Sequence, residues 1–196
     1  MMRFNPPPEP PEFDKKARQP GNTWLAKNPD TKKRPRDYWS PFKSHLADGF
    51  GNLCGYSAMY EPVGTVDHYL CCENHRHLAY EWNNYRYASG WLNSSKRTLD
   101  EQILDPFQVG DDWFEIILPS LQLVLTDAVP LHERNRAAFT LERLHLRDDE
   151  RVIRQRQSWY QLFLDGKLTL AGLEEKAPLI ARAIRRQQQD SSAIQQ

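Results

Sequence analysis

The sequence predicts an α+β fold, and three observations lead to this prediction. Short segments such as Thr65–Tyr69 and Asn84–Ala88 alternate polar and apolar residues between turn residues, as half-buried strands do. Two further apolar segments flank Pro119-Ser120 and predict a β-hairpin. From Pro130 onward the apolar residues recur with helical spacing. Strands and helices that occupy separate parts of a chain are typical of the α+β class.

The first 37 residues differ from the rest of the chain. They contain the proline-rich run FNPPPEPPEF and the basic run TKKRPR, with little apolar periodicity. A segment of this composition buries too little apolar surface to fold alone. We therefore expect residues 1–37 to form an extended arm that folds only against the body of the protein or against a partner.

Residues 38–110 are expected to form the central module. The Ser-Pro pair at 40–41 is a favourable helix start, with serine as the N-cap and proline at the first helical position, and Gly49 ends this helix. Within residues 65–97 the predicted order is strand, loop, strand, helix, and the helix opens after Gly90.

Residues 111–196 are expected to contain the hairpin and several helices. Asp148 can cap a helix that Gly166 ends, and Pro178 restarts the last helical segment. No group of catalytic residue types stands out here. The apolar helix faces either complete the core or dock a partner, so we expect this region to bind a partner protein.

Composition narrows the classes of protein that fit. The chain has 196 residues, of which 39% are hydrophobic, enough for a packed core. No apolar run is long enough to span a membrane and the start lacks the apolar segment of a signal peptide, so we expect a cytoplasmic protein. Three cysteines, two of them adjacent, favour reduced thiols over a disulfide scaffold.

Charge is zero overall but unevenly spread. Residues 1–50 carry 10 basic and 6 acidic side chains, a balance of +4, and residues 151–196 carry 8 and 4, also +4. Residues 101–150 carry 4 and 11, a balance of −7. The two basic ends can meet phosphate, whereas the acidic block suits a basic partner surface. A net charge of zero argues against tight binding to nucleic acid by the chain alone.

One stretch concentrates residue types that carry chemistry, and it reads VDHYLCCENHRHLAYEWNNYRYASGWLNSSK. Asp67 and His68 are consecutive in a strand, so their side chains point to opposite faces. Asn84 opens the second strand and Asn93 lies in the short helix. A single histidine in a strand is most often a packing or hydrogen-bonding residue. The combination of these four residues predicts a functional site.

The combination resembles the HNH nuclease superfamily. The motif elements are V-D-H in a strand, an asparagine at the next strand and N-x-x-K in a helix. In this family the third motif residue can be asparagine. The resemblance implies a small ββα-metal nuclease module, strongest over residues 51–97. The continuation through ILDPF, DDWFEI and FTLERLHL also resembles a subgroup, the HNH subunits of two-component bacterial anti-phage systems of the Septu or retron-associated kind.

The resemblance implies roles for individual residues. His68 resembles the general base that takes a proton from water, and Asp67 and Asn93 resemble the ligands of one divalent metal. Asn84 resembles the asparagine that braces the loop after the histidine by hydrogen bonds to its backbone. The predicted phosphate contacts are Arg86, Lys96 and Arg97, together with the basic run Lys32, Lys33 and Arg34, for which a solvated linker is an equal alternative.

The chemistry of phosphodiester hydrolysis requires such residue types. A neutral imidazole, with a pKa of about 6.5, supplies a base near neutral pH. A metal ion neutralises charge on the phosphate and on the leaving oxygen. Oxygen ligands from Asp and Asn suit Mg²⁺, with Mn²⁺ as a substitute, better than Zn²⁺. We therefore expect a Mg²⁺-dependent endonuclease that cuts nucleic acid, with duplex DNA as the favoured substrate.

The resemblance also implies partners. The subgroup works with an SMC-like or ABC-type ATPase, so we expect an effector nuclease of a bacterial antiviral defence complex, with an oligomer inside that complex left open. Many HNH proteins hold a structural zinc with two Cys-x-x-Cys pairs. Here the corresponding runs are CGYS, starting at Cys54, and SGWL, starting at Ser89. With one thiol of four, no structural zinc is expected.

Two alternatives stay open. Cys71, Cys72, His75 and His77 could bind zinc and make the chain a binding module, but their spacing matches no closed zinc site. The other alternative is a catalytically silent nucleic-acid-binding or adaptor module of the same fold. The presence of all four motif residues argues against it, because a silent copy need not keep them.

Overall fold

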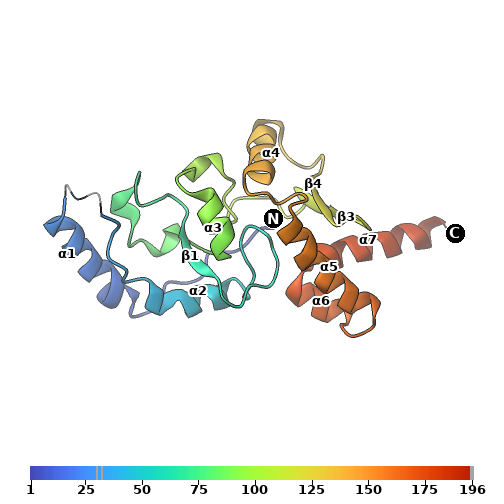
Figure 1. The fold of residues 1–196 in the computed structure, drawn as a ribbon, viewed down its shortest axis with the longest axis horizontal. Coiled ribbons are helices and arrows are strands. Elements are labelled where there is room, and N and C mark those ends of the chain that lie inside the picture. Colours follow the sequence, from blue (N-terminus) through green and yellow to red (C-terminus); the bar gives the residue numbers. More distant parts are fainter. Residues whose placement is uncertain (30, 32, 195–196) are drawn as a thin grey trace.

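The computed structural model describes residues 1–29, 31 and 33–194, and it has a mixed α+β fold, as the sequence predicts. Two antiparallel sheets of two strands each lie among the helices (Figure 1). The chain begins near the middle of the molecule, beside the C-terminal helices, whereas the helix of the N-terminal arm lies at one end and the C-terminus at the other. Within the described residues, no helix combines the length and the apolar character needed to cross a bilayer.

The central module has the predicted order of elements. Strand β1 (Thr65–His68) pairs in antiparallel register with β2 (Tyr85–Ala88), and helix α3 (Gly90–Lys96) follows at once. In this register His68 lies opposite Tyr85. The prediction of strand, loop, strand and helix across residues 65–97 is confirmed.

Helix α2 (Lys43–Gly49) ends at the glycine that the sequence indicated, and a 3-10 turn, Ser40–Phe42, precedes it. The cap differs from the prediction. Asp37 accepts hydrogen bonds from the backbone amides of Trp39 and Ser40, at 3.1 and 2.9 Å. The carboxylate three residues before the turn therefore binds the amides at its start, and the hydroxyl of Ser40 donates to the same carboxylate instead of capping the helix.

The arm is helical over part of its length, which corrects the expectation of an extended segment. A π-helical turn, Asp14–Arg18, runs directly into α1 (Gln19–Lys27). Phe13, Ala17 and Gly21 are buried, and they recur every four residues. This spacing places all three on one side of a helix, so the arm buries a narrow apolar face against the body.

The contact between arm and body is close. A Cβ atom on Gly21 would lie 2.4 Å from the ring of Tyr80, so only glycine fits there. The ring of Phe13 packs edge-on against Trp82 and Tyr85, with centroids 5.2 and 5.7 Å apart. These contacts make Phe4, Phe13 and Ala17 of the arm part of the aromatic core that supports β2.

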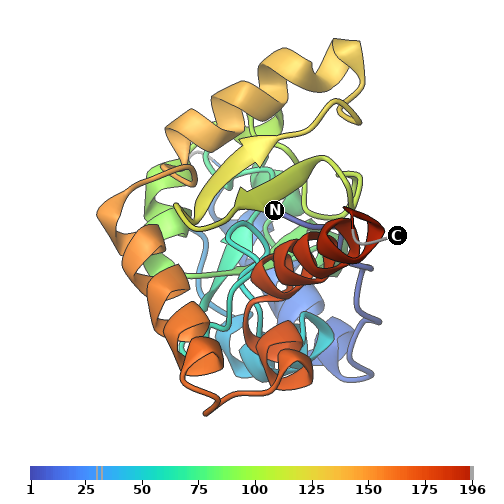
Figure 2. The ribbon, with the colours of Figure 1, turned by 90° about the vertical axis from the view of Figure 1, so that its right-hand side faces the viewer.

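The C-terminal region forms a second core. It contains the hairpin of β3 (Phe114–Ile117) and β4 (Gln122–Leu125), which the sequence predicts, and four helices. These helices are α4 (Arg134–Arg143), α5 (Glu150–Leu164), α6 (Leu170–Lys176) and α7 (Pro178–Ile194). Figure 2 shows the hairpin between α4 and α7.

One buried arginine joins the hairpin to α5. Arg156 is 1% exposed, and its guanidinium donates to the backbone carbonyls of Leu121, Leu146 and Arg147 at 2.6–2.9 Å. Asp149 caps the same helix by accepting from the backbone amide of Arg151, one residue later than the sequence indicated. The bonds of Arg156 therefore tie the turn of the hairpin, at Leu121, to the segment that connects α4 and α5.

Candidate functional site

An open cleft of about 880 Å³ joins three parts of the chain that are distant in sequence. The arm contributes Thr31, Lys33, Arg34 and Pro35; β1 and its following loop contribute Val66, Asp67, His68, Cys71, Cys72, Glu73 and Arg76; and α3 with its end contributes Asn93, Arg97 and Thr98. The predicted base, both predicted metal ligands and three predicted phosphate contacts therefore line the same cleft. Lys32, the remaining residue of the basic run, lies outside the described residues.

His68 is held in a defined orientation. It is 7% exposed, and the rings of Trp39 and Tyr85 meet it edge-on, with centroids 4.6 and 4.9 Å away. Nε2 lies 2.9 Å from the carbonyl oxygen of Ala79. Because a carbonyl only accepts, Nε2 must carry the proton and donate it. Nδ1 is then the nitrogen with a free lone pair, and no described residue hydrogen-bonds to it.

Burial also keeps this imidazole neutral. The pKa of His68 is lowered from 6.5 to about 4, mainly because the ring is removed from water and in smaller part because of the charges of Arg34 and Lys96. The Ala79 carbonyl and Asp67 oppose the shift. Near neutral pH the ring is therefore an unprotonated base, fixed in one tautomer by its hydrogen bond.

The lowered pKa makes the stability of the fold depend on pH. The unfolded imidazole takes up a proton near pH 6.5 and the folded one near pH 4, so between these values the unfolded state binds more protons. The free energy of unfolding should rise with pH across this range, by about 3 kcal/mol from this residue, and level off above it.

Urea unfolding in EDTA, from about pH 4 to pH 8, measures this dependence. His68→Gln is the matched variant, because every carboxylate still titrates in it. We expect the variant to show a flatter rise between pH 4 and 6.5 than the wild type. Parallel curves for the two proteins would contradict the buried, neutral state of His68.

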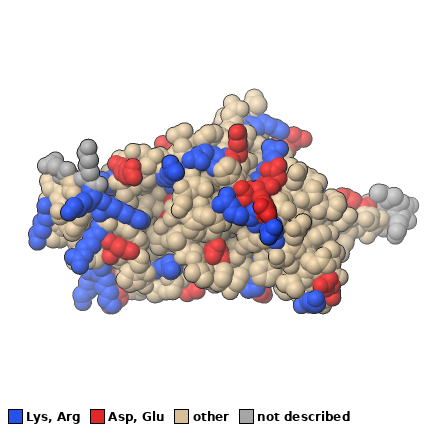
Figure 3. Space-filling view, in the orientation of Figure 1, with Lys and Arg blue, Asp and Glu red and all other residues tan. Residues whose placement is uncertain are grey.

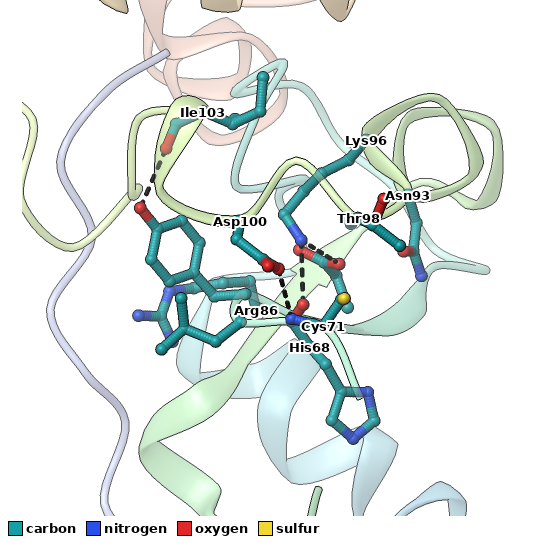
Figure 4. A network of polar contacts seen from close by, with 12 residues as sticks. His68, Cys71, Arg86, Asn93, Lys96, Thr98, Asp100 and Ile103 are labelled. Atoms are coloured by element: carbon teal, nitrogen blue, oxygen red, sulfur yellow. Dashed lines mark hydrogen bonds and ion pairs between the residues drawn. The ribbon is translucent and has the colours of Figure 1, made fainter. Parts of the chain in front are cut away.

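Asp67 lies beside His68 but faces a different set of groups. It is 2% exposed, and both carboxylate oxygens already accept hydrogen bonds. The hydroxyl of Tyr56 donates to Oδ2 at 2.6 Å, and Nζ of Lys96 donates to Oδ1 at 3.1 Å. Figure 4 shows the ring of His68 pointing away from Lys96, in agreement with the alternation of side chains along a strand.

Asn84 hydrogen-bonds to the loop that follows His68. Its Oδ1 accepts from the backbone amide of Leu70 at 2.8 Å, and its Nδ2 donates to the carbonyls of Leu70 and Leu78 at 2.9 and 3.2 Å. The side chain thus ties the first residues of the loop to its far end. This geometry is the backbone bracing that the sequence resemblance implies for Asn84.

Asn93, the second predicted metal ligand, also lines the cleft. Its Nδ2 donates to Thr65 Oγ1 at 3.1 Å and to the Val66 carbonyl at 3.3 Å, which holds α3 against β1. No described residue hydrogen-bonds to its Oδ1. An amide oxygen and the carboxylate of Asp67 therefore line one cleft, and two hard oxygen ligands completed by water fit Mg²⁺.

No three His, Cys, Asp or Glu side chains converge as a metal-binding group in the part of the chain that the structure describes. This observation also bears on the zinc alternative. Cys54, Cys71 and Cys72 are free thiols, and His75 faces Asp100, with Nε2 3.5 Å from Oδ2. The Cys-His run therefore does not come together as a closed zinc site in this structure.

Two predicted phosphate contacts do not fit their positions. Arg86 is 3% exposed, and it forms a two-point ion pair with Asp105, with both N–O distances 2.7 Å. Lys96 has no exposure and pairs with Asp67. Both charges are paired inside the protein, so in this conformation neither side chain can contact the phosphate backbone of a nucleic acid at the surface.

Three other predicted phosphate contacts stay open to solvent. Lys33, Arg34 and Arg97 are exposed and line the cleft. In Figure 3, Lys and Arg side chains gather over the end of the molecule that the arm forms. Arg97 follows α3 with a φ of +51°, a backbone conformation that favours glycine.

Three residues that the sequence analysis did not assign shape the site. Tyr56 orients Asp67, and Trp39 packs on His68. Arg76 donates from Nη1 to the Lys33 carbonyl at 3.0 Å, while its buried Nε and Nη2 have no hydrogen-bond partner among the described residues. Arg76 lies between two histidines in sequence, and this run of His-Arg-His is the only sequence signal that could have indicated it.

No family model, no curated protein and no solved structure matches this chain. The chemistry of the cleft is therefore inferred from the residues that line it. They provide a neutral imidazole, the side-chain oxygens of Asp67 and Asn93 and a basic rim, with the loop beside the imidazole braced by an asparagine.

Proposed function

We propose that the chain is a metal-dependent endonuclease of the HNH type, which hydrolyses phosphodiester bonds of nucleic acid in this cleft. One observation carries the proposal. His68, Asp67 and Asn93 line the same cleft as the basic residues of the arm, and the hydrogen bond to Ala79 leaves Nδ1 of His68 as a base. Such a combination is required for in-line attack of water on a phosphate.

In this proposal each side chain has a defined task. Nδ1 of His68 takes a proton from the attacking water, and the imidazole stays oriented by its bond to Ala79. Asn84 keeps the loop beside the base in place. Arg34 and Arg97, both exposed at the cleft, hold the negatively charged backbone of the substrate.

Asp67 and Asn93 would hold the divalent metal through oxygen atoms, and Mg²⁺ is the ion that this ligand set suits. When bound, such an ion supplies positive charge to the phosphate and to the leaving oxygen. The order of the elements, β1, β2 and then α3, is the order that the resemblance to the ββα-metal nucleases implies, and it supports the proposal. Duplex DNA is the proposed substrate, and an SMC-like or ABC-type ATPase is the proposed partner of the C-terminal region.

Plasmid cleavage tests this proposal. The purified chain, alone and with its candidate ATPase, is incubated with plasmid DNA and with a structured RNA in Mg²⁺, Mn²⁺ or EDTA. We expect nicked or linear DNA in Mg²⁺ and Mn²⁺ and intact DNA in EDTA. Intact DNA and RNA under every condition would reject the nuclease.

A second candidate function has one observation in its favour. Both oxygens of Asp67 are already occupied, by Tyr56 and by Lys96, so the carboxylate is not free in this conformation. A catalytically silent nucleic-acid-binding or adaptor module needs no free ligand. It predicts metal-independent binding of DNA in the same experiment, without any cleavage.

Arg97 offers a test of the basic rim. Arg97→Gly should leave the free energy of unfolding unchanged or raise it by up to about 1 kcal/mol, because glycine suits the positive φ. The same change should weaken binding of a short DNA duplex in EDTA by about five- to tenfold and should lower the salt dependence by one phosphate contact.

Fluorescence anisotropy of a labelled duplex at several salt concentrations measures the DNA affinity, and urea unfolding measures the stability. Arg97→Gln should weaken DNA binding as much as Arg97→Gly does, but it should not raise the free energy of unfolding. Arg154, which is exposed on α5 and outside the cleft, supplies the matched control Arg154→Gln, with an expected loss below about twofold. Equal effects at positions 97 and 154 would show that the cleft is not the binding surface.

A further inference from the structure

Lys96 is a charged side chain to which the proposed mechanism gives no task. It ends α3 and has no exposure to solvent. Its ammonium donates to Oδ1 of Asp67 at 3.1 Å and to the backbone carbonyl of His68 at 2.9 Å, and Figure 4 shows it reaching the end of β1. A buried ammonium is costly unless it is paired, and Asp67 provides the pair.

A divalent ion that binds Asp67 from the cleft must share this carboxylate with Lys96. Tyr56 already donates to Oδ2 and Lys96 to Oδ1. Two cations on one buried carboxylate repel each other strongly, because little water lies between them. Binding of the ion and pairing with Lys96 therefore oppose each other.

We propose that Lys96 is the internal counter-cation of Asp67 and that it sets the metal affinity of the site by competing for this carboxylate. The inference rests on the proposed metal site at Asp67 and Asn93. Lys96 is then a positioning residue, which keeps the carboxylate paired and oriented before an ion arrives and leaves Oδ1 when the ion binds. Its burial makes the metal site weaker than its oxygen ligands alone would make it.

Metal binding by the full chain tests this inference. Free Mn²⁺ is measured by electron paramagnetic resonance during titration of wild type and Lys96→Met, and thermal unfolding is followed with and without Mn²⁺. We expect Lys96→Met to unfold at a lower temperature than wild type in EDTA, to bind Mn²⁺ about tenfold more tightly, and to gain more thermal stability from Mn²⁺.

Two controls show whether the effect passes through Asp67. In the double variant Asp67→Asn/Lys96→Met, the gain in Mn²⁺ affinity should disappear. Lys167 forms an exposed ion pair with Asp165, and Lys167→Met should bind Mn²⁺ like wild type. Lys96→Met that binds Mn²⁺ no more tightly than wild type would overturn the inference.

A measurement on the wild type covers the case in which Lys96→Met does not fold even with Mn²⁺. Acetylation of amines, read by mass spectrometry, should spare the buried Lys96 in EDTA and should label it several-fold more in Mn²⁺, while Lys167 is labelled equally in both. Labelling of Lys96 that Mn²⁺ leaves unchanged would then overturn the inference.

The outcome is separate from that of the nuclease proposal. Cleavage by wild type together with unchanged Mn²⁺ affinity in Lys96→Met rejects the role of Lys96 and leaves the nuclease standing. Tighter Mn²⁺ binding by Lys96→Met, in a chain that cuts neither DNA nor RNA, supports the role of Lys96 and rejects the nuclease.

Discussion

His68→Ala is expected to lower the single-turnover rate of nucleic-acid cleavage by about 10³-fold, within the range of about 10² to 10⁴ that a lost general base usually costs. The reason is that Nδ1 is the free basic nitrogen of a ring whose other nitrogen donates to Ala79. Single-turnover cleavage of an end-labelled duplex in Mg²⁺, with enzyme in excess, measures the chemical step apart from product release.

The alanine variant leaves a gap between Trp39 and Tyr85, so a second variant separates chemistry from packing. His68→Gln keeps an amide N–H that can donate to the Ala79 carbonyl but has no basic nitrogen. We expect both variants to bind the duplex like wild type in EDTA and both to lose cleavage. A rate for His68→Gln within about tenfold of wild type would exclude His68 as the base.

Asp105→Asn is expected to lower the free energy of unfolding by about 3–5 kcal/mol, because it leaves the charge of Arg86 buried without its partner. Both side chains are nearly inaccessible, at 4% and 5% exposure, and the guanidinium also lies 3.6 Å from the ring centroid of Phe107. Arg86 lies opposite Asp67 in the sheet register, so the loss should also loosen Asp67, the proposed metal ligand.

Urea unfolding in EDTA, with Asp127→Asn as the matched control, measures this effect. Asp127 pairs with Arg134 at the surface, and its loss should cost less than about 1 kcal/mol. The double variant Arg86→Met/Asp105→Leu should recover most of the stability, since an apolar pair leaves no buried charge. Equal losses of unfolding free energy for Asp105→Asn and Asp127→Asn would show that the buried Arg86–Asp105 pair contributes no more to stability than a surface pair.

The order of elements around His68 follows from local sequence, which is why it could be predicted. Alternating residues and glycines within residues 65–97 indicate two strands and a helix, and these local preferences agree with the fold. The helix in the arm was missed because prolines outweighed the spacing of Phe13, Ala17 and Gly21. That spacing forms a buried helix face only because the ring of Tyr80, which is distant in sequence, packs against Gly21.

The candidate site was predicted less completely, for a physical reason. Lysine and arginine are usually surface residues, so Lys96 and Arg86 were predicted to contact phosphate. Both are buried because each pairs with a carboxylate that is distant in sequence, 29 residues away for Lys96 and 19 for Arg86. A single sequence holds no signal for such pairs, because ion-pair geometry depends on the tertiary fold. The same applies to the hydroxyl of Tyr56 and to the carbonyl of Ala79, which orient Asp67 and His68.

The protonation state of His68 is the most direct test of whether this cleft holds a poised base. Nitrogen-15 NMR of histidine-labelled protein in EDTA near neutral pH resolves the imidazole tautomers, and His68→Gln identifies the signal among the six histidines. We expect a neutral ring with its proton on Nε2 and an unprotonated Nδ1. A proton on Nδ1, or a charged imidazolium at this pH, would contradict the role of His68 as the base.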